Sequence, residues 1–508
     1  MLAKTVCFAL NGLDGFVTEA EVDINNGLPG FEIVGLADTA VRESRERIRS
    51  AIKNSGEKFP SRKITVNLAP ADIKKEGSSF DLAVAVGVLK ATEQLVADTK
   101  DYVFLGELSL DGRIRRINGI MPILISALKA GFKKFVIPKE NEKEASYIAD
   151  ADVYACATLK DVIGHFSGEK PVSVSEKRSF QSAMHEKKYT ADLSFVKGQA
   201  VAKRALEIAV SGGHNILLIG PPGTGKTMLA RCIPTIMPSL TFEEALECTR
   251  IHSVAGTLSD EEGIVTLRPF RCPHHTATTV SLIGGGTKYV KPGEISLAHN
   301  GVLFLDEMPE YARAALESLR QPLEDGVVSI SRIHSSVTYP ANFILCGSMN
   351  PCPCGNLGSK DKPCTCTPAQ IARYRAKLSG PLLDRIDLQV EVDGVSYGEL
   401  VAERKEETSE TVRKRVEAAR KIQRARFKTD GIYTNAAMGE RQLEKYCRLS
   451  ADCERVLKRA YETLKLSARA RSRIVKVART IADMEGSGEI KVSHILESVS
   501  YRRADIQG

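Results

Sequence analysis

The chain has 508 residues, of which 43% are hydrophobic and 26% are charged, and it carries a formal net charge of +8. This length allows three or four domains, and the mildly basic balance permits nucleic-acid binding without demanding it. No segment approaches the roughly 20 apolar residues of a membrane span, and the N-terminus is too soon interrupted for a signal peptide, so we expect a cytoplasmic protein without a membrane partner. Twelve cysteines in so long a chain exclude a dense disulfide framework.

Residues 1–167 are predicted to form a compact α/β domain. Apolar and alternating runs predict strands at 20–24, 31–34, 63–68, 102–105 and 134–137. Helical periodicity predicts helices at 40–53, 80–90 and 121–129. The polar stretch 168–191, which is poor in large apolar residues, is then a linker.

An ATPase module is predicted over residues 192–394, with the stretch NILLIGPPGTGKTM at its centre. The apolar run ILLI is typical of a strand buried on both faces. The next eight residues fit G-x-x-x-x-G-K-[ST], a loop that cradles phosphates with backbone N–H groups and a helix N-terminus. They are Gly220, Pro221, Pro222, Gly223, Thr224, Gly225, Lys226 and Thr227. We expect Lys226 to reach the β- and γ-phosphates of ATP and the Thr227 hydroxyl to bind Mg²⁺.

A long insertion over residues 268–294 precedes the next core strand and is rich in Gly, Pro and His without a strong period. Its adjacent His274 and His275 have diverging side chains, and we expect no carboxylate partner near them. The insertion is therefore predicted to be a structural or pore-facing loop rather than a metal site.

The stretch GVLFLDE, residues 301–307, has four apolar residues followed by two acids. This pattern is typical of a central parallel strand that delivers carboxylates to the ligand-binding edge of its sheet. We expect Asp306 to hold Mg²⁺ through water and Glu307 to polarise the water that attacks ATP.

A helix is predicted at 316–325, a hairpin at 327–338 and another core strand at 343–349, which ends at Asn350. A polar residue at such a strand end can orient the attacking water, as sensor 1 does in the AAA+ ATPases that this region resembles. We assign that role to Asn350; a simple turn-forming asparagine is the alternative.

Four cysteines follow in the pattern C-x-C, nine residues, C-x-C, namely Cys352, Cys354, Cys364 and Cys366. Four thiolates can bind Zn²⁺ in a tetrahedron and close the loop. The tight C-x-C spacing strains a shared tetrahedron, so free reduced thiols in a mobile loop stay the alternative. Lys360 and Lys362 on this loop either contact phosphates or are solvated.

Arg385 follows a short apolar turn in SGPLLDRIDL. An arginine at the edge of an ATPase module can reach the γ-phosphate in a neighbouring subunit and stabilise the transition state. The alternative is an intrachain salt bridge with Asp384 or Asp387. If Arg385 is such a finger, the enzyme must work as an oligomer.

Residues 395–508 are predicted to form a charged helical lid. Its helices are expected at 408–426, 450–464, 469–484 and 493–500. Arg469 opens a helix that would fold back over the nucleotide and supply sensor 2, with Arg473 as the second choice. A solvated arginine is the alternative for both.

The front domain resembles the Lon-type protease fold, of the ribosomal S5 domain 2-like type, in the segments KKEGSSFDLAVAVGVL and GELSLDGRIRRINGIMPILISALKAGF. In that family a Ser and a Lys form the catalytic dyad. Ser79 falls at the Ser position, but Met121 occupies the Lys position, and a thioether cannot take a proton. We therefore expect a domain without peptidase activity, in which Ser79 caps a helix.

The whole chain resembles the magnesium-chelatase-like AAA+ ATPases of the YifB/ComM type. The motifs that carry the resemblance are GPPGTGKT, FRCPHHT, GGGTKYVKPGEISLAHNGVLFLDE, LRQPLEDG, NPCPCG and GPLLDRIDL. It implies an α/β multidomain protein with a Lon-like front domain, an AAA+ core and a helical lid, with ATP and Mg²⁺ as cofactors. Within VKGQ, Gln199 is similar to an AAA+ position that packs near the adenine, although a plain amphipathic helix start is the alternative.

The same resemblance implies a hexameric ring around DNA that acts as a branch-migration helicase in recombination during natural transformation. Its partners would be single-stranded, duplex or branched DNA, with recombination proteins beside it. On this interpretation, the residues that face the pore and grip phosphates are Lys288, Tyr289, Lys291, Arg332 and His334.

Two other functions stay open. The chain could be a protein-directed AAA+ unfoldase or regulator that uses the front domain for docking. It could also be the ATPase motor of a magnesium chelatase, although such a motor has no need of a Lon-like domain. DNA-stimulated ATP hydrolysis would favour the DNA motor, and stimulation by a protein partner would favour the unfoldase.

Overall fold

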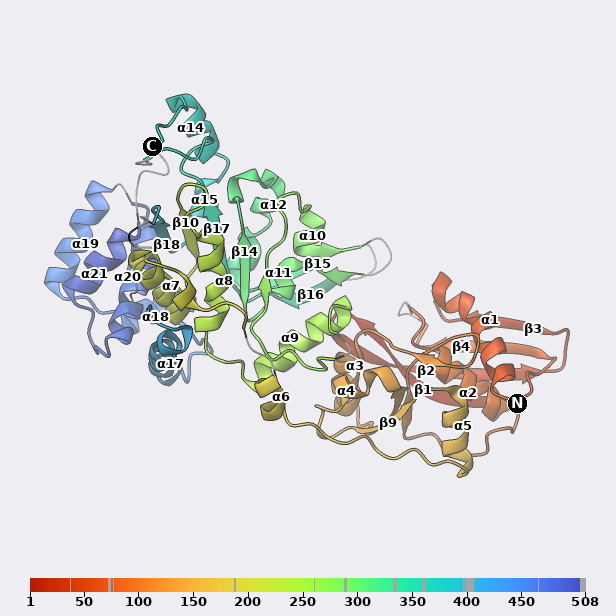
Figure 1. Ribbon diagram of the computed structural model, residues 1–508. Coiled ribbons are helices and arrows are strands. Elements are labelled where there is room, and N and C mark those ends of the chain that lie inside the picture. The colour runs from red at the N-terminus through yellow and green to blue at the C-terminus, as the bar shows by residue number, and fades with distance from the viewer. Residues whose placement is uncertain are drawn as a thin grey trace.

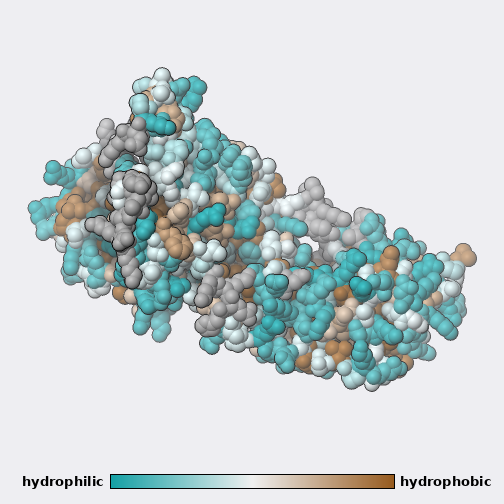
Figure 2. Space-filling view, viewed as in Figure 1, coloured by the Kyte–Doolittle hydropathy of each residue, from teal (hydrophilic) through white to brown (hydrophobic). Residues whose placement is uncertain are grey.

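The computed structural model describes residues 1–36, 38–71, 75, 77–186, 189–259, 261–286, 290–331, 336–358, 362–395, 398, 406–464 and 466–502. Figure 1 shows an elongated molecule with the front domain at one end, the ATPase module in the middle and a helical part at the other end. On the face seen in Figure 2, hydrophilic side chains predominate and apolar ones are scattered. None of the described helices combines the length and the apolar character that a membrane span requires.

The front domain is built on a seven-stranded sheet in the order β3-β4-β2-β1-β5-β8-β9. The strands are β1 (Leu2–Asn11), β2 (Asp14–Asn25), β3 (Gly30–Val34), β4 (Lys63–Ala69), β5 (Tyr102–Phe104), β8 (Lys134–Pro138) and β9 (Asp152–Cys156), with a small hairpin of β6 (Glu107–Leu108) and β7 (Ile114–Arg115). The five predicted strands are confirmed, whereas β1 and β9 were missed. The apolar run in β1 does not alternate because it is buried on both faces of the sheet.

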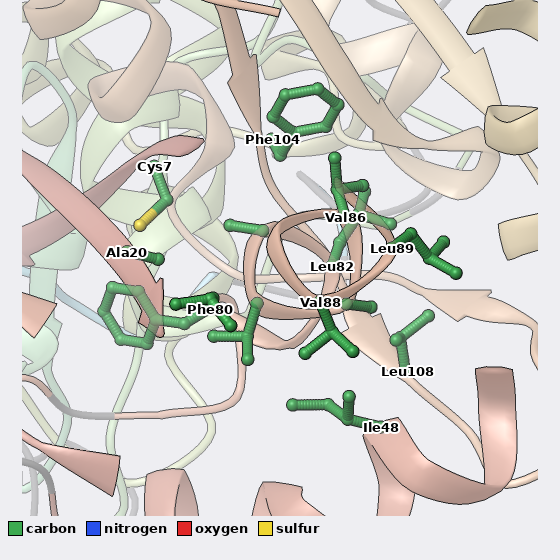
Figure 3. Close-up of a cluster of buried hydrophobic side chains, with 14 of the residues drawn as sticks. Cys7, Ala20, Ile48, Phe80, Leu82, Val86, Val88, Leu89, Phe104 and Leu108 are labelled. Carbon is green, nitrogen blue, oxygen red and sulfur yellow. The ribbon is translucent and has the colours of Figure 1, made fainter. Parts of the chain in front are cut away.

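Helices cover both faces of this sheet. Cys7 and Ala9 of β1 belong to one core and Phe8 to the other, because successive strand residues point to opposite sides. The first core contains α1 (Thr39–Asn54), α2 (Asp81–Ala91) and α5 (Leu159–Ser167), and the second contains α3 (Ile120–Lys129) and α4 (Glu142–Ala145). Figure 3 shows α2 enclosed between sheet residues such as Ala20 and Ile48 of α1.

The two positions of the expected protease dyad have structural roles. Helix α2 begins after Phe80 without a side-chain cap, so the prediction that Ser79 caps this helix is wrong. The neighbouring Ser78 hydroxyl donates a hydrogen bond to Glu107 instead. Met121 is fully buried in the core under α3, where its thioether packs against apolar side chains.

The ATPase module contains a five-stranded parallel sheet in the order β11-β14-β17-β10-β18. The strands are β10 (Ile216–Ile219), β11 (Phe270–Arg271), β14 (Val302–Leu305), β17 (Ile344–Met349) and β18 (Leu388–Glu391). Ile216 and Leu218 face one core, with α7 (Ala200–Gly212) and α8 (Lys226–Ile236), and Leu217 faces the other. Strand β11 lies within residues 268–294, which were expected to be an insertion. That expectation is wrong for the start of the segment, because β11 forms the edge strand of the sheet.

Apart from the long helix α9, the remaining elements of the module have eight residues or fewer. They are η2 (Leu193–Phe195), α9 (Phe242–Ala255), α10 (Thr279–Ile283), β12 (Gly284–Gly285), β13 (Lys291–Pro292), α11 (Glu294–Leu297), η3 (Met308–Glu310), α12 (Arg313–Glu317), α13 (Arg320–Asp325), β15 (Val327–Ser331), β16 (Ser336–Pro340), α14 (Pro368–Arg375) and α15 (Gly380–Leu383). The predicted hairpin is confirmed as β15 and β16, whereas the helix predicted at 316–325 is divided between α12 and α13.

The C-terminal part is helical, as predicted. Its helices are α17 (Ser409–Arg426), α18 (Glu440–Tyr446), α19 (Ala451–Thr463), α20 (Ala468–Met484) and α21 (Val492–Ser500), with a short turn η4 (Asn435–Ala437). Val416 of α17 and Ile481 of α20 belong to the same core as the P-loop strand. The helical part is therefore packed directly onto the ATPase sheet.

The front domain also packs on the ATPase module, through α9. Ser253 of α9 donates a hydrogen bond to Glu144 and accepts one from the backbone N–H of Gly119 at 3.0 Å. One apolar cluster joins the two parts through Leu13, Ile251, Leu297, Val337 and Tyr339. Even the expected linker is docked, because it contains α6 (Phe180–Glu186), whose Phe180 ring lies 5.6 Å from that of Phe242.

Candidate ATP site

Three neighbouring parallel strands end at the same edge of the ATPase sheet, and each brings a predicted site segment with it. The P-loop follows β10, Asp306 and Glu307 follow β14, and Asn350 follows β17. These segments line an open cavity of about 370 Å³, made by residues 222–227, 306–307 and 348–350. Segments that lie as far apart in sequence as residues 222 and 350 thus meet at the position where open α/β sheets bind ligands.

The P-loop has the backbone geometry that its glycines allow. Gly223 and Gly225 have φ values of 80° and 87°, in the left-handed region. At Gly220 a Cβ atom would lie 2.1 Å from the carbonyl oxygen of Val392, so a side chain has no room between the loop and the end of β18. Helix α8 begins at Lys226, and its N-terminus faces the cavity with free backbone N–H groups, which suit an anion.

Lys226 is held inside the loop. Its Nζ atom donates hydrogen bonds to the carbonyl oxygens of Gly220 and Pro221 at 2.6 and 2.8 Å and lies 3.3 Å from Asn350 Oδ1. Burial lowers the pKa of Lys226, although the nearby carboxylates of Asp306 and Glu307 oppose this shift. The ammonium group is thus placed where it can exchange carbonyl partners for phosphate oxygens.

Thr227 and Asp306 form a pair of oxygen ligands across the cavity. The Thr227 hydroxyl donates to Asp306 Oδ2 at 2.9 Å, and the Ser348 hydroxyl donates to Asp306 Oδ1. A hydroxyl and a carboxylate beside a phosphate loop are the donor set that Mg²⁺ takes in such sites, so these residues fit the ion. Ser348 was not predicted, because a serine inside a strand carries no motif signal.

Glu307 stands at a strained position at the mouth of the cavity. Its φ is 50°, which is uncommon for a residue with a side chain, and its backbone N–H donates to Ser348 Oγ at 3.1 Å. The exposed side chain points toward His275, whose Nδ1 lies 3.8 Å from Glu307 Oε2. The expectation that no carboxylate lies near the histidine pair is therefore wrong. The expectation that the two side chains diverge is also wrong, because their ring centroids lie 4.1 Å apart.

The loop that carries His275 is fixed from both sides. Tyr311 Oη donates to the carbonyl oxygen of Pro273 at 2.6 Å, and Arg271 pairs with Glu294 through bonds of 2.6 and 2.8 Å. The sequence did not identify His275 as a site residue, because its contact with Glu307 joins residues 32 positions apart. The parallel pairing of β11 and β14 brings the two together.

Gln199 also lies beside the phosphate loop. It adopts φ 57° just before α7, and its side-chain amide donates to the carbonyl oxygens of Thr224 at 3.4 Å and Asp393 at 2.6 Å. The VKGQ segment therefore contacts the phosphate loop and the chain after β18, and its place near an adenine stays a prediction.

The predicted arginines lie outside the cavity lining. Arg385 is buried, pairs with Glu324 and donates to the carbonyl oxygen of Pro381 at 2.8 Å. The salt bridge expected as its alternative was with Asp384 or Asp387, and Asp387 pairs with Arg473 instead. Burial raises the pKa of Asp387, but the charge of Arg473 outweighs this effect and holds that pKa below its usual range. Arg473 therefore forms an ion pair with a buried carboxylate. The described lining residues do not include Arg469.

The four cysteines of the loop after Asn350 converge. Their Sγ atoms all lie within 4.8 Å of one another. Of the predicted pore residues, Lys291 is exposed at the start of β13. Lys288, Tyr289, Arg332 and His334 lie outside the described residues.

Comparison with known proteins covers nearly the whole chain. Residues 192–400 match the family described as magnesium chelatase, subunit ChlI; residues 20–141 match subunit ChlI of Mg-chelatase, and residues 406–502 match its C-terminal family. The competence protein ComM of Haemophilus influenzae is 43% identical over 99% of this chain and 97% of its own. YifB of Salmonella typhimurium is 45% identical over 96% of this chain and 94% of its own. A Lon protease of Azospirillum brasilense is 31% identical over 112 residues, 21% of this chain and 14% of its own.

Proposed function

Because the chain belongs to the magnesium-chelatase-like AAA+ ATPases of the ComM and YifB type, we propose that it is an ATP-hydrolysing DNA motor that works as a hexameric ring. The observation that carries the proposal is the single cavity that gathers the P-loop, Asp306, Glu307 and Asn350. ATP and Mg²⁺ are its cofactors. A zinc ion in the cysteine quartet (Cys352, Cys354, Cys364 and Cys366) is part of the same proposal.

Each residue of the cavity has one task in ATP hydrolysis. The P-loop backbone and Lys226 hold the phosphates, and Thr227 and Asp306 hold Mg²⁺, which neutralises charge on the β- and γ-phosphates. Glu307 polarises the attacking water and Asn350 orients it. The strained backbone of Glu307 keeps its carboxylate exposed at the mouth of the cavity instead of buried in the strand end.

A ring would add an arginine to the positive charge that Lys226 already supplies in each cavity. No arginine is found among the described residues that line the cavity, yet phosphoryl transfer gains most from an arginine at the γ-phosphate. We assign Arg385 of a neighbouring subunit to this position and Arg469 to sensor 2.

DNA is the proposed substrate because ComM of Haemophilus influenzae, a relative that aligns over 99% of this chain, is named a competence protein. Branch migration during recombination of incoming DNA is the matching activity. Lys288, Tyr289, Lys291, Arg332 and His334 would then face the pore and grip phosphates. The hairpin strands β15 and β16 lie on the side of the module near the front domain (Figure 1).

The test is ATP turnover by the purified protein with single-stranded, duplex and four-way-junction DNA over a salt series, with Glu307→Gln as the inactive control. We expect stimulation that declines as salt rises, because phosphate contacts release counterions. If no DNA changes the rate of ATP turnover and only a protein partner stimulates it, the DNA-motor proposal would be wrong and a protein-directed AAA+ machine would be favoured.

A further inference from the structure

The cysteine quartet has the geometry of one mononuclear metal site. Cys352 Sγ lies 3.4 Å from Cys354 Sγ and 3.6 Å from Cys364 Sγ, and the Cys354 and Cys364 sulfurs are 3.6 Å apart. Four thiolates at about 2.3 Å from one Zn²⁺ in a tetrahedron would be about 3.8 Å apart, close to these separations. A cluster of two or four irons would hold some of the sulfurs further apart, because thiolates on different irons do not share a ligand shell.

The backbone around the quartet is arranged for thiolates. The N–H of Leu357 donates to Cys352 Sγ at 3.3 Å, and the N–H of Cys354 donates to Cys366 Sγ at 3.4 Å. The N–H of Gly355 closes the turn on the carbonyl oxygen of Cys352 at 3.0 Å. Such N–H donors stabilise ionised sulfur and orient it toward a shared ion.

This loop also touches the ATP cavity at two places. Cys352 is fully buried two residues after Asn350. At Gly355, a Cβ atom would come within 2.6 Å of Pro222 Cδ in the P-loop. After the last cysteine, Thr367 caps α14, and Tyr374 of that helix hydrogen-bonds to the backbone of Asn350. The chain therefore leaves the cavity at Asn350 and returns to it after passing through all four cysteines.

We propose that the quartet binds one Zn²⁺ and that the closed loop acts as a clasp, which holds Asn350 and the P-loop at the separation that ATP requires. The clasp extends the ATP-site part of the proposed function and does not depend on DNA. Without the ion, four reduced thiols give no crosslink, so the loop is free to leave Pro222 and Asn350 loses its support.

Metal content tests the ion. By elemental analysis, purified full-length protein should carry one zinc per chain, and a mercurial that blocks the thiols should release it. The double variant Cys354→Ser, Cys366→Ser should contain less than about 0.2 zinc per chain. Cys272→Ser removes an exposed thiol outside the quartet and should keep the zinc. Metal-free wild-type protein from zinc-supplemented cells, or iron in place of zinc, would overturn the site.

Two glycines of the same loop test the clasp. Gly355 and Gly358 both have φ of 80°, but among the described residues only Gly355 faces another group, since none of their atoms lies within 4 Å of a Cβ at Gly358. Gly355→Ala should keep its zinc and lose about 10-fold or more in ATP turnover, because small displacements at a reacting centre are costly. Gly358→Ala carries the same backbone strain and should stay within about 3-fold of wild type.

Equal losses in the two variants would overturn the clasp while leaving the zinc site intact. The outcome is read without DNA, so a failed DNA response cannot be mistaken for a failed clasp. Binding of a fluorescent ATP analogue to zinc-stripped and zinc-restored protein gives a second readout: affinity should fall on stripping and return with zinc, and an unchanged affinity would contradict the coupling.

Discussion

His275 Nδ1 lies 3.8 Å from Glu307 Oε2, at the mouth of the cavity where ATP is expected to bind. The two residues come from the ends of neighbouring strands, β11 and β14. Since His275 and α10 belong to the same insertion, this contact connects the proposed general base with a segment that carries some of the predicted DNA contacts.

His275→Ala should lower kcat for ATP about 3- to 10-fold and leave KM nearly unchanged, because an exposed carboxylate that loses its neighbour samples more orientations. Steady-state ATP hydrolysis over a range of ATP concentrations measures both constants. His274→Ala is the matched control: the His274 ring lies tilted against that of His275 with a centroid distance of 4.1 Å, and its Nδ1 hydrogen-bonds to Thr276 Oγ1. A similar loss in both variants would assign the effect to loop packing.

Lys226→Ala and Glu307→Gln should separate binding from hydrolysis. Removing the ammonium group should weaken ATP binding by about 10-fold or more, since hydrogen bonds to charged phosphate are lost. Glu307→Gln keeps the P-loop intact and should bind ATP normally while hydrolysis falls about 100-fold or more. Titration with a fluorescent nucleotide and phosphate release measure the two effects. Equal loss of affinity in both variants contradicts the division of roles.

Arg385→Ala should abolish hydrolysis, by about 1,000-fold for an arginine at the transition state, while ATP affinity changes little. Because Arg385 pairs with Glu324 within its own chain, Glu324→Gln serves as a control for loss of that pair alone. Mixed rings of Arg385→Ala and Lys226→Ala subunits should regain some activity where an intact site meets an intact arginine. No recovery, together with an equal defect in Glu324→Gln, would assign Arg385 a structural role only.

Glu144 should make stability depend on pH. Burial raises its pKa to about 7 from 4.5, against the opposing effects of Ser253, the Met121 N–H and Arg116. Between these values the folded state holds a proton that the unfolded state has lost, so stability decreases as pH rises from about 4.5 to 7, by at most about 3 kcal/mol.

Glu144→Gln should remove that slope and raise Tm at pH 8 while leaving it nearly unchanged at pH 5. The neighbouring Glu142 provides a control of opposite sign: although burial opposes the shift, bonds from Lys139 and Ser175 lower its pKa. Glu142→Gln should therefore cost stability above its normal pKa. Calorimetry from pH 5 to pH 8 measures Tm for wild type and both variants. A Glu144→Gln variant that is less stable than wild type at pH 8 would contradict the prediction.

The sequence was sufficient to predict the parts of the candidate site that consist of contiguous residues. The P-loop, the acids after β14 and the asparagine after β17 each follow an apolar strand, and parallel pairing then brings them together. What could not be predicted depends on contacts between distant segments. Ser348, His275 and the Arg385–Glu324 pair have no local signal, β11 is too short to show a period, and the lack of a cap at Ser79 follows from how α2 is packed.

The apolar cluster of Leu13, Ile251, Leu297, Val337 and Tyr339 has a consequence for how the chain can be divided. A protease that cuts between residues 168 and 191 would leave this cluster and the Ser253–Glu144 bond intact. The two fragments should therefore stay together through size-exclusion chromatography, and a genome could encode the front domain as a separate polypeptide without losing its attachment to the ATPase.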